Sequence, residues 1–424
     1  MKYIKCSGEV FEFNLLTSEG ICQNCKKVTS VFFIPSQKKR WCKDCFSQFF
    51  ERRVKRTVEK YKMFIPHQRI GVCLSGGKDS SSLLWALKKI YPELSLLGIH
   101  INLGIGYYSD IAEEAVKRLC EKIGIPLFIY NLKKEEGYSI DDFVFTHYKR
   151  KICAVCGSIK RYLFSKIAKQ LNLDALATGH HLDDLVSTML SLFFQGDFSS
   201  LLRLSPVIPP LIEGQAKKIK PLCTSPEMEI FYYSVLNELP LEGCSCPHGE
   251  ITPSKKIKKI IEDLEKENHQ IKYQLFSVFN KKLIPLIRLK KEKEILRKCK
   301  LCEQPTDSLE EICGRCRKIM LLEKVPERKL EITLEEFLEK RVKLSPKDYV
   351  VFDLREKEDF EKDSLPDSQW LSSEYLGKSY RELRKFLKPY RGKIVFSRCY
   401  RGITSYFFTL KLRKLGFKAF SIKR

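Results

Sequence analysis

The chain has 424 residues, of which 43% are hydrophobic, 11% aromatic and 30% charged, a composition that excludes fibrous and intrinsically disordered classes. Single hydrophobic cores stop growing near this length, so we expect several domains. The formal net charge of +25 favours a polyanionic partner such as a nucleic acid, without separating RNA from DNA.

The N-terminal residues 1–13 carry charges and no apolar core of signal-peptide length. No stretch approaches the length of apolar sequence that spans a bilayer. The sequence therefore predicts a cytoplasmic protein without membrane contact. In such a chain, 17 cysteines are better explained by metal, cluster and sulfur chemistry than by disulfides.

Two sets of paired CxxC motifs have the spacing of metal-binding knuckles. In each set, two pairs can close a tetrahedral Zn²⁺ site, and four free thiols would leave little apolar material to hold the segment folded. We therefore expect two structural zinc sites, one with Cys22, Cys25, Cys42 and Cys45 and the other with Cys299, Cys302, Cys313 and Cys316.

Between these sets, apolar runs alternate with helical periodicity. The strand-like runs are 69–75, 94–103, 126–132 and 174–179, and helices are predicted from about Ser80, through 113–122 and from near Asp183. This alternation predicts an α/β fold with a doubly wound parallel sheet.

The segment Ser75-Gly-Gly-Lys-Asp-Ser80 follows a predicted strand and begins a helix. Backbone N–H groups and a helix N-terminus at such a junction can bind an anion, and the glycines let phosphate approach closely. The spacing is not that of a Walker A loop, and an ordinary strand-to-helix turn is the alternative. We expect the phosphate-binding residues to be Ser75, Gly76, Gly77, Lys78, Asp79, Ser80 and, after a later strand, Gly179.

Cysteines and a histidine-aspartate segment lie at the same expected edge of the sheet. Cys153-Ala-Val-Cys156 precedes a basic helix, and Gly179-His-His-Leu-Asp-Asp184 follows the next strand. Because ligands bind at the carboxyl ends of parallel strands, both segments should face the phosphate-binding loop. A further cluster, Cys244-Ser-Cys246-Pro-His248, occurs within the same predicted domain.

The SGGKDS segment resembles the pyrophosphate loop of the ATP pyrophosphatase superfamily, whose members transfer AMP to a carbonyl oxygen. Together with the CxxC, GHHLDD, 221–230 and Cys-Pro segments, it resembles the branch of tRNA thiolases that make 2-thiouridine. The zinc knuckles on both sides are similar to those of the group that thiolates the T-loop uridine and of its wobble-uridine relatives. The resemblance covers about 21–316.

The resemblance implies a [4Fe-4S] cluster held by Cys153, Cys156 and Cys246. Three thiolates around four irons leave one iron free to bind an exogenous sulfur. Cys244 is an alternative third ligand, although Pro247 and His248 favour Cys246. A zinc site that includes Cys244, or a persulfide on Cys153 and Cys156, are the other interpretations.

In the implied reaction, ATP with Mg²⁺ lies on the loop beside Lys78, and the uracil oxygen attacks the α-phosphate. Sulfide then attacks the adenylated carbon and AMP leaves. By the resemblance, Lys160 is a catalytic cation near the carbonyl, and Asp184 is a catalytic carboxylate near the metal or phosphates. A solvated lysine and a helix-capping aspartate are the alternatives. Of His180 and His181, at most one should face the site.

Beyond residue 322 we predict a smaller α/β unit with strands at 349–354 and 393–397. Asp353-Leu-Arg355 and the segment 397–405 resemble a rhodanese domain, with Thr404 where an arginine is common. A thiolate at a helix N-terminus has a lowered pKa and can carry a persulfide, so Cys399 is a predicted catalytic sulfur donor. A buried inert cysteine is the alternative.

The expected domains are an N-terminal zinc ribbon with a basic helix (1–60), an ATP pyrophosphatase core (61–295), a second zinc finger (296–322) and a rhodanese-like domain (323–424). Basic runs that suit tRNA, or a solvated helix face, are 51–62, 255–259 and 288–298.

The expected function is ATP-dependent thiolation of tRNA, with the T-loop uridine as the first candidate. The sulfur donor is a persulfide or a thiocarboxylated carrier protein, and a homodimer is compatible with the resemblance. Alternatives are thiolation of a wobble uridine or an anticodon-loop cytidine, amide-bond formation on an adenylated base, a zinc-stabilised RNA-binding scaffold without catalysis, and a sulfur-relay enzyme for small molecules.

Overall fold

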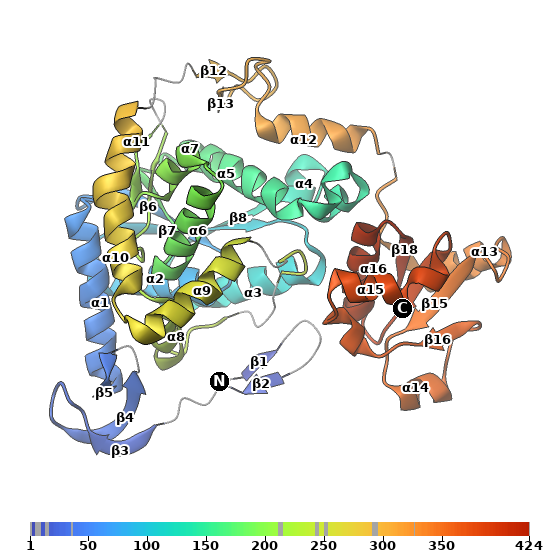
Figure 1. The fold of residues 1–424 in the computed structure, drawn as a ribbon, viewed down its shortest axis with the longest axis horizontal. Coiled ribbons are helices and arrows are strands. Elements are labelled where there is room, and N and C mark those ends of the chain that lie inside the picture. Colours follow the sequence, from blue (N-terminus) through green and yellow to red (C-terminus); the bar gives the residue numbers. More distant parts are fainter. Residues whose placement is uncertain are drawn as a thin grey trace.

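The computed structural model describes residues 2–4, 10–12, 17–34, 37–210, 215–241, 246–249, 253–290, 296–325 and 327–423. Cys244, the alternative cluster ligand, lies outside these residues. Figure 1 shows a central α/β unit, with α1 on one side and a second, smaller α/β unit on the other. In the described parts of the chain, no helix is both long and apolar enough to cross a membrane.

Small antiparallel sheets precede the central unit. Their strands are β1 (Lys2–Ile4) with β2 (Val10–Glu12), and β3 (Ser18–Ile21), β4 (Val28–Ile34) and β5 (Lys39–Trp41). Helix α1 (Lys43–Lys60) follows and packs on α2 and α8 of the central unit. Four of its buried residues recur at every fourth position and so lie on one face: Phe46, Phe50, Val54 and Val58.

The central sheet has the strand order β10-β11-β9-β6-β7-β8. All neighbours are parallel except the edge pair β10 and β11, which is antiparallel. The sequence prediction of an α/β fold with a parallel sheet is confirmed, but the antiparallel edge was not foreseen. The strands are β6 (Arg69–Leu74), β7 (Ser95–Asn102), β8 (Leu127–Asn131), β9 (Ala175–Ala177), β10 (Val207–Ile208) and β11 (Lys217–Ile219).

Helices cover both faces of this sheet. One hydrophobic cluster joins α1, α2, α3, α6 and α8 to one face, and another joins α5 to the opposite face. From β6, the chain adds β7 and β8 on one side of the sheet and later adds β9 and β11 on the other side. The strand order therefore reverses between β6 and β9. A crevice for ligands is expected outside the carboxyl ends of these two strands.

The helices of the central unit begin with α2 (Lys78–Ile90), α3 (Gly106–Ile123), α4 (Leu132–Glu136), α5 (Ile152–Gln170), α6 (Leu182–Phe194) and α7 (Phe198–Leu201). They continue with α8 (Glu227–Leu236), α9 (Pro253–Glu267), α10 (Ile271–Val278), the π-helical turn η5 (Phe279–Leu283) and α11 (Ile284–Lys290). Short 3-10 turns are η2 (Asp141–Phe145), η3 (His147–Arg150) and η4 (Leu202–Leu204). The second cysteine set lies around β12 (Arg297–Lys298), β13 (Pro305–Thr306) and α12 (Gly314–Glu323).

The C-terminal unit contains a parallel sheet of order β14-β18-β17-β15-β16. Both strands predicted there, 349–354 and 393–397, are confirmed. The strands are β14 (Glu331–Thr333), β15 (Tyr349–Asp353), β16 (Ser368–Trp370), β17 (Ile394–Arg398) and β18 (Lys418–Lys423). The helices are α13 (Leu334–Val342), α14 (Lys357–Lys362), α15 (Tyr380–Phe386) and α16 (Ile403–Leu415), with turns η6 (Ser373–Leu376) and η7 (Lys388–Tyr390).

Candidate functional site

The loop between β6 and α2 is closed on itself and packed against α3. The backbone N–H of Ser75 donates to Ser80 Oγ over 3.1 Å, and Ser80 Oγ donates to the Gly77 carbonyl over 3.2 Å. Gly76 has φ +84°, and a Cβ there would approach Ala112 Cα to 3.0 Å. A side chain at this position is excluded by both conformation and space, so the loop keeps its backbone accessible at the N-terminus of α2.

Lys78 lies between two carboxylates. Its Nζ is 3.1 Å from Asp79 Oδ1 and 2.9 Å from Glu227 Oε1, and Glu227 also pairs with Lys258. Burial raises the pKa of Glu227, but Lys78 and Lys258 outweigh it and lower that pKa to about 2. The sequence pointed to the 221–230 segment but did not predict a role for Glu227.

The GHHLDD segment contacts the loop directly. A Cβ at Gly179 would lie 3.0 Å from the Ser80 backbone nitrogen, so only glycine allows this approach. His181 is buried, and its Nε2 is 3.1 Å from Asp184 Oδ2. His180 is exposed and hydrogen-bonds Thr178. Lys160 and Lys220 lie within electrostatic reach of His180, so the expectation that at most one histidine faces the site stays a prediction.

The adjacent aspartates have different surroundings. Asp183 is buried, accepts a hydrogen bond from the Glu227 backbone N–H over 2.8 Å and pairs with Lys272 Nζ at 2.6 Å. The Asp184 side chain is 48% exposed. Burial raises the pKa of Asp184, and the charges of Asp79 and Glu227 raise it further, although those of His181 and Lys258 lower it. Asp184 therefore belongs to the charged group around the Ser75–Ser80 loop, whereas Asp183 connects the helices that carry Glu227 and Lys272.

Cys153 and Cys156 lie at the N-terminal end of α5, and Cys246 is within electrostatic reach of both, although the three sulfurs do not form a group within 4.8 Å of one another. Cys153 and Cys156 are three residues apart and therefore on one face of this helix. Burial raises the pKa of Cys246 to about 11, and charge on Cys156 and Cys153 raises it, although a backbone hydrogen bond from His248 lowers it. Cys153 Sγ donates to the His248 carbonyl over 3.1 Å.

Lys160 lies one helical turn beyond Cys156 on α5 and is half-buried. Burial raises the pKa of Cys156, and the charge of Lys160 lowers it, so the two side chains lie within electrostatic reach. The structure thus brings the predicted lysine to the predicted cysteines.

Further cations gather beside this site. Burial lowers the pKa of Lys218, and the charges of Arg161 and Arg203 lower it further, although Cys73 raises it. Burial likewise lowers the pKa of Lys220 to about 8; its Nζ donates to the carbonyls of Arg203 and Ser205 over 3.1 and 2.7 Å. Their mutual repulsion favours an anionic ligand. The sequence alone did not single out this group of cations, because its members come from three separate segments, α5, η4 and β11 with the residue after it.

A groove of about 340 Å³ runs beside α1. Its exposed cations recur every fourth residue, at Arg52, Arg56 and Lys60. Phe49, Arg53, Thr57 and Thr224 complete the lining. The basic run predicted at 51–62 therefore contributes a positive surface as well as a buried face.

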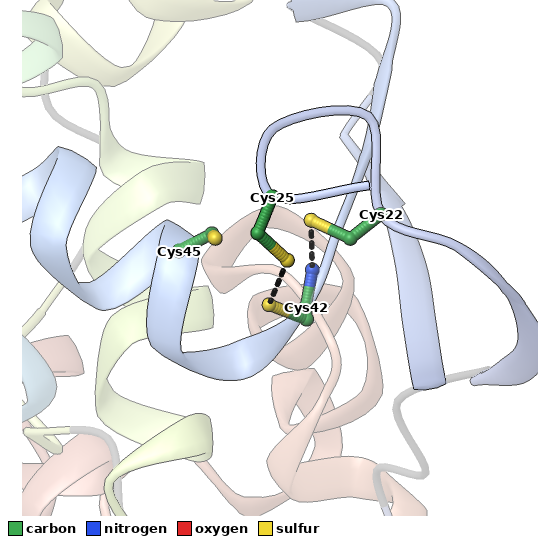
Figure 2. Close-up of side chains that lie close together, drawn as sticks. All are labelled: Cys22, Cys25, Cys42 and Cys45. Atoms are coloured by element: carbon green, nitrogen blue, oxygen red, sulfur yellow. Dashed lines mark hydrogen bonds between the residues drawn. The ribbon is translucent and has the colours of Figure 1, made fainter. Parts of the chain in front are cut away.

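Both predicted CxxC sets converge. In each set, the four sulfur atoms lie within 4.8 Å of one another, and Figure 2 shows the first set, with its sulfurs pointing toward a common centre. Burial raises the pKa of Cys22, but backbone N–H groups of Cys25, Cys42 and Asn24 donate hydrogen bonds and lower it to about 6. The matching position in the second set, Cys299, also has its pKa lowered to about 6 despite burial. Both sets could bind a metal ion.

Cys399 lies between β17 and α16 and is 5% exposed. Its sulfur accepts a hydrogen bond from the Ser405 backbone N–H over 3.4 Å. Gly402, with φ +79°, caps the helix N-terminus. Asp353 and Arg355 form a buried ion pair of 2.8 Å at the end of the neighbouring strand. The predicted strand-loop-helix arrangement is present.

Comparison with known proteins identifies relatives of most of the chain. A family model described as a PP-loop domain matches residues 46–240. The tRNA-5-methyluridine(54) 2-sulfurtransferase of Pyrococcus horikoshii is 35% identical over 65% of this chain and 86% of its own. The protein of the same name from Thermotoga maritima is 34% identical over 72% of this chain and 97% of its own.

A solved structure has a similar fold. The U34-tRNA thiolase NcsA from Methanococcus maripaludis, determined with its [4Fe-4S] cluster, has a TM-score of 0.59 and 24% identity. The similarity covers 72% of this chain and 96% of that one. At this identity, the comparison supports the fold of the matched region.

Proposed function

Because the chain belongs to the PP-loop family that includes the tRNA-5-methyluridine(54) 2-sulfurtransferases, we propose that it uses ATP to convert a uridine of tRNA into 2-thiouridine. The observation that supports this most strongly is the placement of Lys160 one helical turn from Cys156, in a site shared with Cys153 and Cys246. The relatives' names make uridine 54 the first candidate target. A wobble uridine is the alternative.

ATP binding is assigned to Ser75–Ser80 and Gly179. Lys78 would exchange its contact with Glu227 for a contact with the ATP phosphates, which carry more negative charge than one carboxylate. The positive end of the helix dipole at the N-terminus of α2 would also attract the phosphates. Asp79, Asp184 and Glu227 are suited to hold Mg²⁺, because burial and, to a smaller degree, the charges of Asp79 and Glu227 raise the pKa of Asp184, and a divalent cation would offset both effects. Bound Mg²⁺ would neutralise the phosphates during adenylation.

The donor set fits a [4Fe-4S] cluster held by Cys153, Cys156 and Cys246. His248, two residues beyond Cys246, has a buried Nδ1 without a hydrogen-bond partner among the described residues, as expected beside a group with acceptor or donor atoms. Such a cluster, held by three thiolates, supplies an iron on which sulfide becomes a nucleophile. Lys160 would stabilise negative charge on the carbonyl oxygen of the base.

The two four-cysteine sets are suited to structural Zn²⁺. Tetrahedral zinc with bonds of about 2.3 Å requires sulfurs about 3.8 Å apart. Cys25 and Cys42 are 3.9 Å apart, and Cys302 and Cys313 are 3.6 Å apart. Four thiolates leave no open position, which suits a structural role.

The tRNA would bind across the basic surfaces. Arg161, Arg203 and Lys218 lie beside the cysteine site, where they would attract the phosphates that flank the target base. The groove with Arg52, Arg56 and Lys60 offers a second contact with the backbone.

Sulfur supply is assigned to Cys399 in a rhodanese-like C-terminal domain. Its sulfur accepts the Ser405 N–H at the N-terminus of α16 and could carry a persulfide. A thiocarboxylated carrier protein is the alternative donor. We further propose the division into 1–60, 61–295, 296–322 and 323–424, a cytoplasmic location that suits a tRNA enzyme with many free thiols, and a homodimer as the assembly to be tested.

The test is anaerobic purification, with iron and sulfide analysis, followed by thiolation of unmodified tRNA with ATP and sulfide. Mass spectrometry of nucleosides should detect 2-thiouridine and assign its position. Lys160→Ala should reduce the rate about 100-fold or more, while Lys169→Ala, at the exposed far end of α5, should not. Equal activity of both variants would refute the role of Lys160. Binding of tRNA without any ATP-dependent product would favour an RNA-binding scaffold.

A further inference from the structure

Three buried side chains connect the C-terminal unit to the cysteine site. Tyr406, on α16, donates a hydrogen bond from its hydroxyl to Asp141 Oδ2. The second oxygen of Asp141 is 2.5 Å from His248 Nε2. The exposed fractions of Tyr406, Asp141 and His248 are 6%, 1% and 2%, so water does not compete for these contacts.

His248 then reaches cysteines from two separate segments. It lies two residues after Cys246, and its carbonyl accepts the hydrogen bond from Cys153 Sγ over 3.1 Å. A displacement of His248 would therefore move Cys246 through the chain and release Cys153 through this contact.

The surroundings of Tyr406 fix its position. A Cβ added to Gly106 would lie 2.4 Å from the Tyr406 ring, and the Tyr107 ring packs edge-on against it at 6.2 Å between centroids. Seven residues further along α16, the Arg413 guanidinium lies 4.8 Å from the centroid of the Phe145 ring. Helix α16 is thus seated on the central unit, and Tyr406 belongs to the same hydrophobic cluster as α5.

Asp141 needs both of its partners. A buried carboxylate is costly unless hydrogen-bond donors or cations compensate it, and loss of one donor leaves an unsatisfied oxygen. The aspartate can turn toward its remaining partner or admit water, and either response disturbs the His248 ring. The contact from the C-terminal unit is consequently part of what holds the cysteine segment in place.

We propose that Tyr406 and Asp141 are positioning residues of the cysteine site: the C-terminal unit, docked through Tyr406, fixes the segment that carries Cys246 and His248. The proposal rests on the proposed function only in treating Cys153, Cys156 and Cys246 as the reactive sulfurs. The C-terminal unit then supports the site structurally, in addition to any role of Cys399.

The same docking brings the Cys399 loop toward the ATP loop. A Cβ at Gly402 would meet the Tyr107 hydroxyl at 3.1 Å, and Ala112, five residues along α3, contacts Gly76. Five helical residues span about 7.5 Å. The loops of the two units therefore pack against the same first turns of α3.

The test compares Tyr406→Phe with Tyr349→Phe in the full chain, loaded with zinc but free of iron. Tyr349 is a matched control, because it is also buried in the C-terminal unit and its hydroxyl also donates to a carboxylate, Asp367, over 2.8 Å. Alkylation by iodoacetamide would be followed at each cysteine by peptide mass spectrometry. We expect Cys153 and Cys246 to react about five- to tenfold faster in Tyr406→Phe and unchanged in Tyr349→Phe.

Asp141→Asn tests the same contact from the side of the central unit, without changing a residue of α16, and should also accelerate alkylation. Buried Cys120 reports on the fold, and its protection shows that a variant is intact. Wild-type rates at Cys153 and Cys246 in intact Tyr406→Phe or Asp141→Asn protein would overturn the proposal.

A second readout uses protein reconstituted with iron and sulfide. Absorbance should decay faster under chelation in Tyr406→Phe than in Tyr349→Phe, and equal decay would count against the proposal. If wild-type protein accepts no cluster, the proposed function fails at that point, whereas the alkylation experiment still decides whether Tyr406 positions the cysteines.

Discussion

Substitutions of the adjacent residues Asp183 and Asp184 should have different effects: the first should lower stability, and the second should lower activity. Asp183→Asn removes the charge that pairs with buried Lys272 at 2.6 Å. Breaking a buried pair costs about 3–5 kcal/mol. Lys272 keeps a second partner, Glu265, also at 2.6 Å, and asparagine can still accept the Glu227 N–H, so we expect about 2–3 kcal/mol.

Asp184→Asn should leave stability within about 0.5 kcal/mol, since its side chain is 48% exposed. The rate at which the Asp184→Asn variant forms AMP in the presence of tRNA should nevertheless fall about 100-fold or more. Urea unfolding, followed by the fluorescence of the three tryptophans, and AMP release in a single turnover measure the two effects separately. Equal destabilisation by the two substitutions would refute the assigned roles, as would full activity of Asp184→Asn.

The Asp183 contribution also has a pH dependence. Burial raises the pKa of Asp183, but His181 and Lys272 lower it well below its usual 3.8. Its folded pKa is depressed, so the stabilisation is fully present above pH 3.8 and is lost as pH falls through the folded value. Burial lowers the pKa of His181, but its hydrogen bond with Asp183 and the charges of Asp184 and Asp79 raise that pKa above 6.5. The stabilisation of protonated His181 by Asp183 is therefore present at pH 5 and lost as pH rises, so the difference in unfolding free energy between wild type and Asp183→Asn should be larger at pH 5 than at pH 8.

Three further predictions concern metal, sulfur and RNA. Removal of zinc by a chelator should expose the loops that carry Cys22, Cys25 and Cys42 to proteolysis, with protection restored by Zn²⁺, because the four sulfurs would then no longer be joined, whereas Phe32 and Trp41 should still hold the strands on the core. Cys399→Ser should abolish thiolation with thiosulfate as donor and leave thiolation with free sulfide unchanged; loss with both donors would contradict a donor role. Arg161→Glu and Lys218→Glu should each weaken tRNA binding, measured as a salt slope reduced by about 1 in a binding titration, whereas Lys169→Glu should have little effect.

The order of elements could be predicted because hydrophobic periodicity and glycine signals are local. Strand β6, the loop at Ser75–Ser80 and helix α2 follow from adjacent residues, and both four-cysteine sets follow from spacing. The edge strand β10 was missed, because two residues carry no alternation pattern. Glu227 lies 149 residues from Lys78, and only the completed fold brings these side chains together.

The relation between the two parallel sheets is the feature that the sequence least reveals. Each sheet presents its candidate reactive loop where a strand ends and a helix begins, Ser75–Ser80 after β6 and Cys399 after β17, since backbone N–H groups are unpaired at that junction. That rule applies within each sheet separately. Their placement on the first turns of α3 depends on Tyr406 and Gly402, whose neighbours lie hundreds of residues earlier. A motif can therefore identify a reactive loop, but the positioning of one loop relative to another is encoded in long-range side-chain contacts.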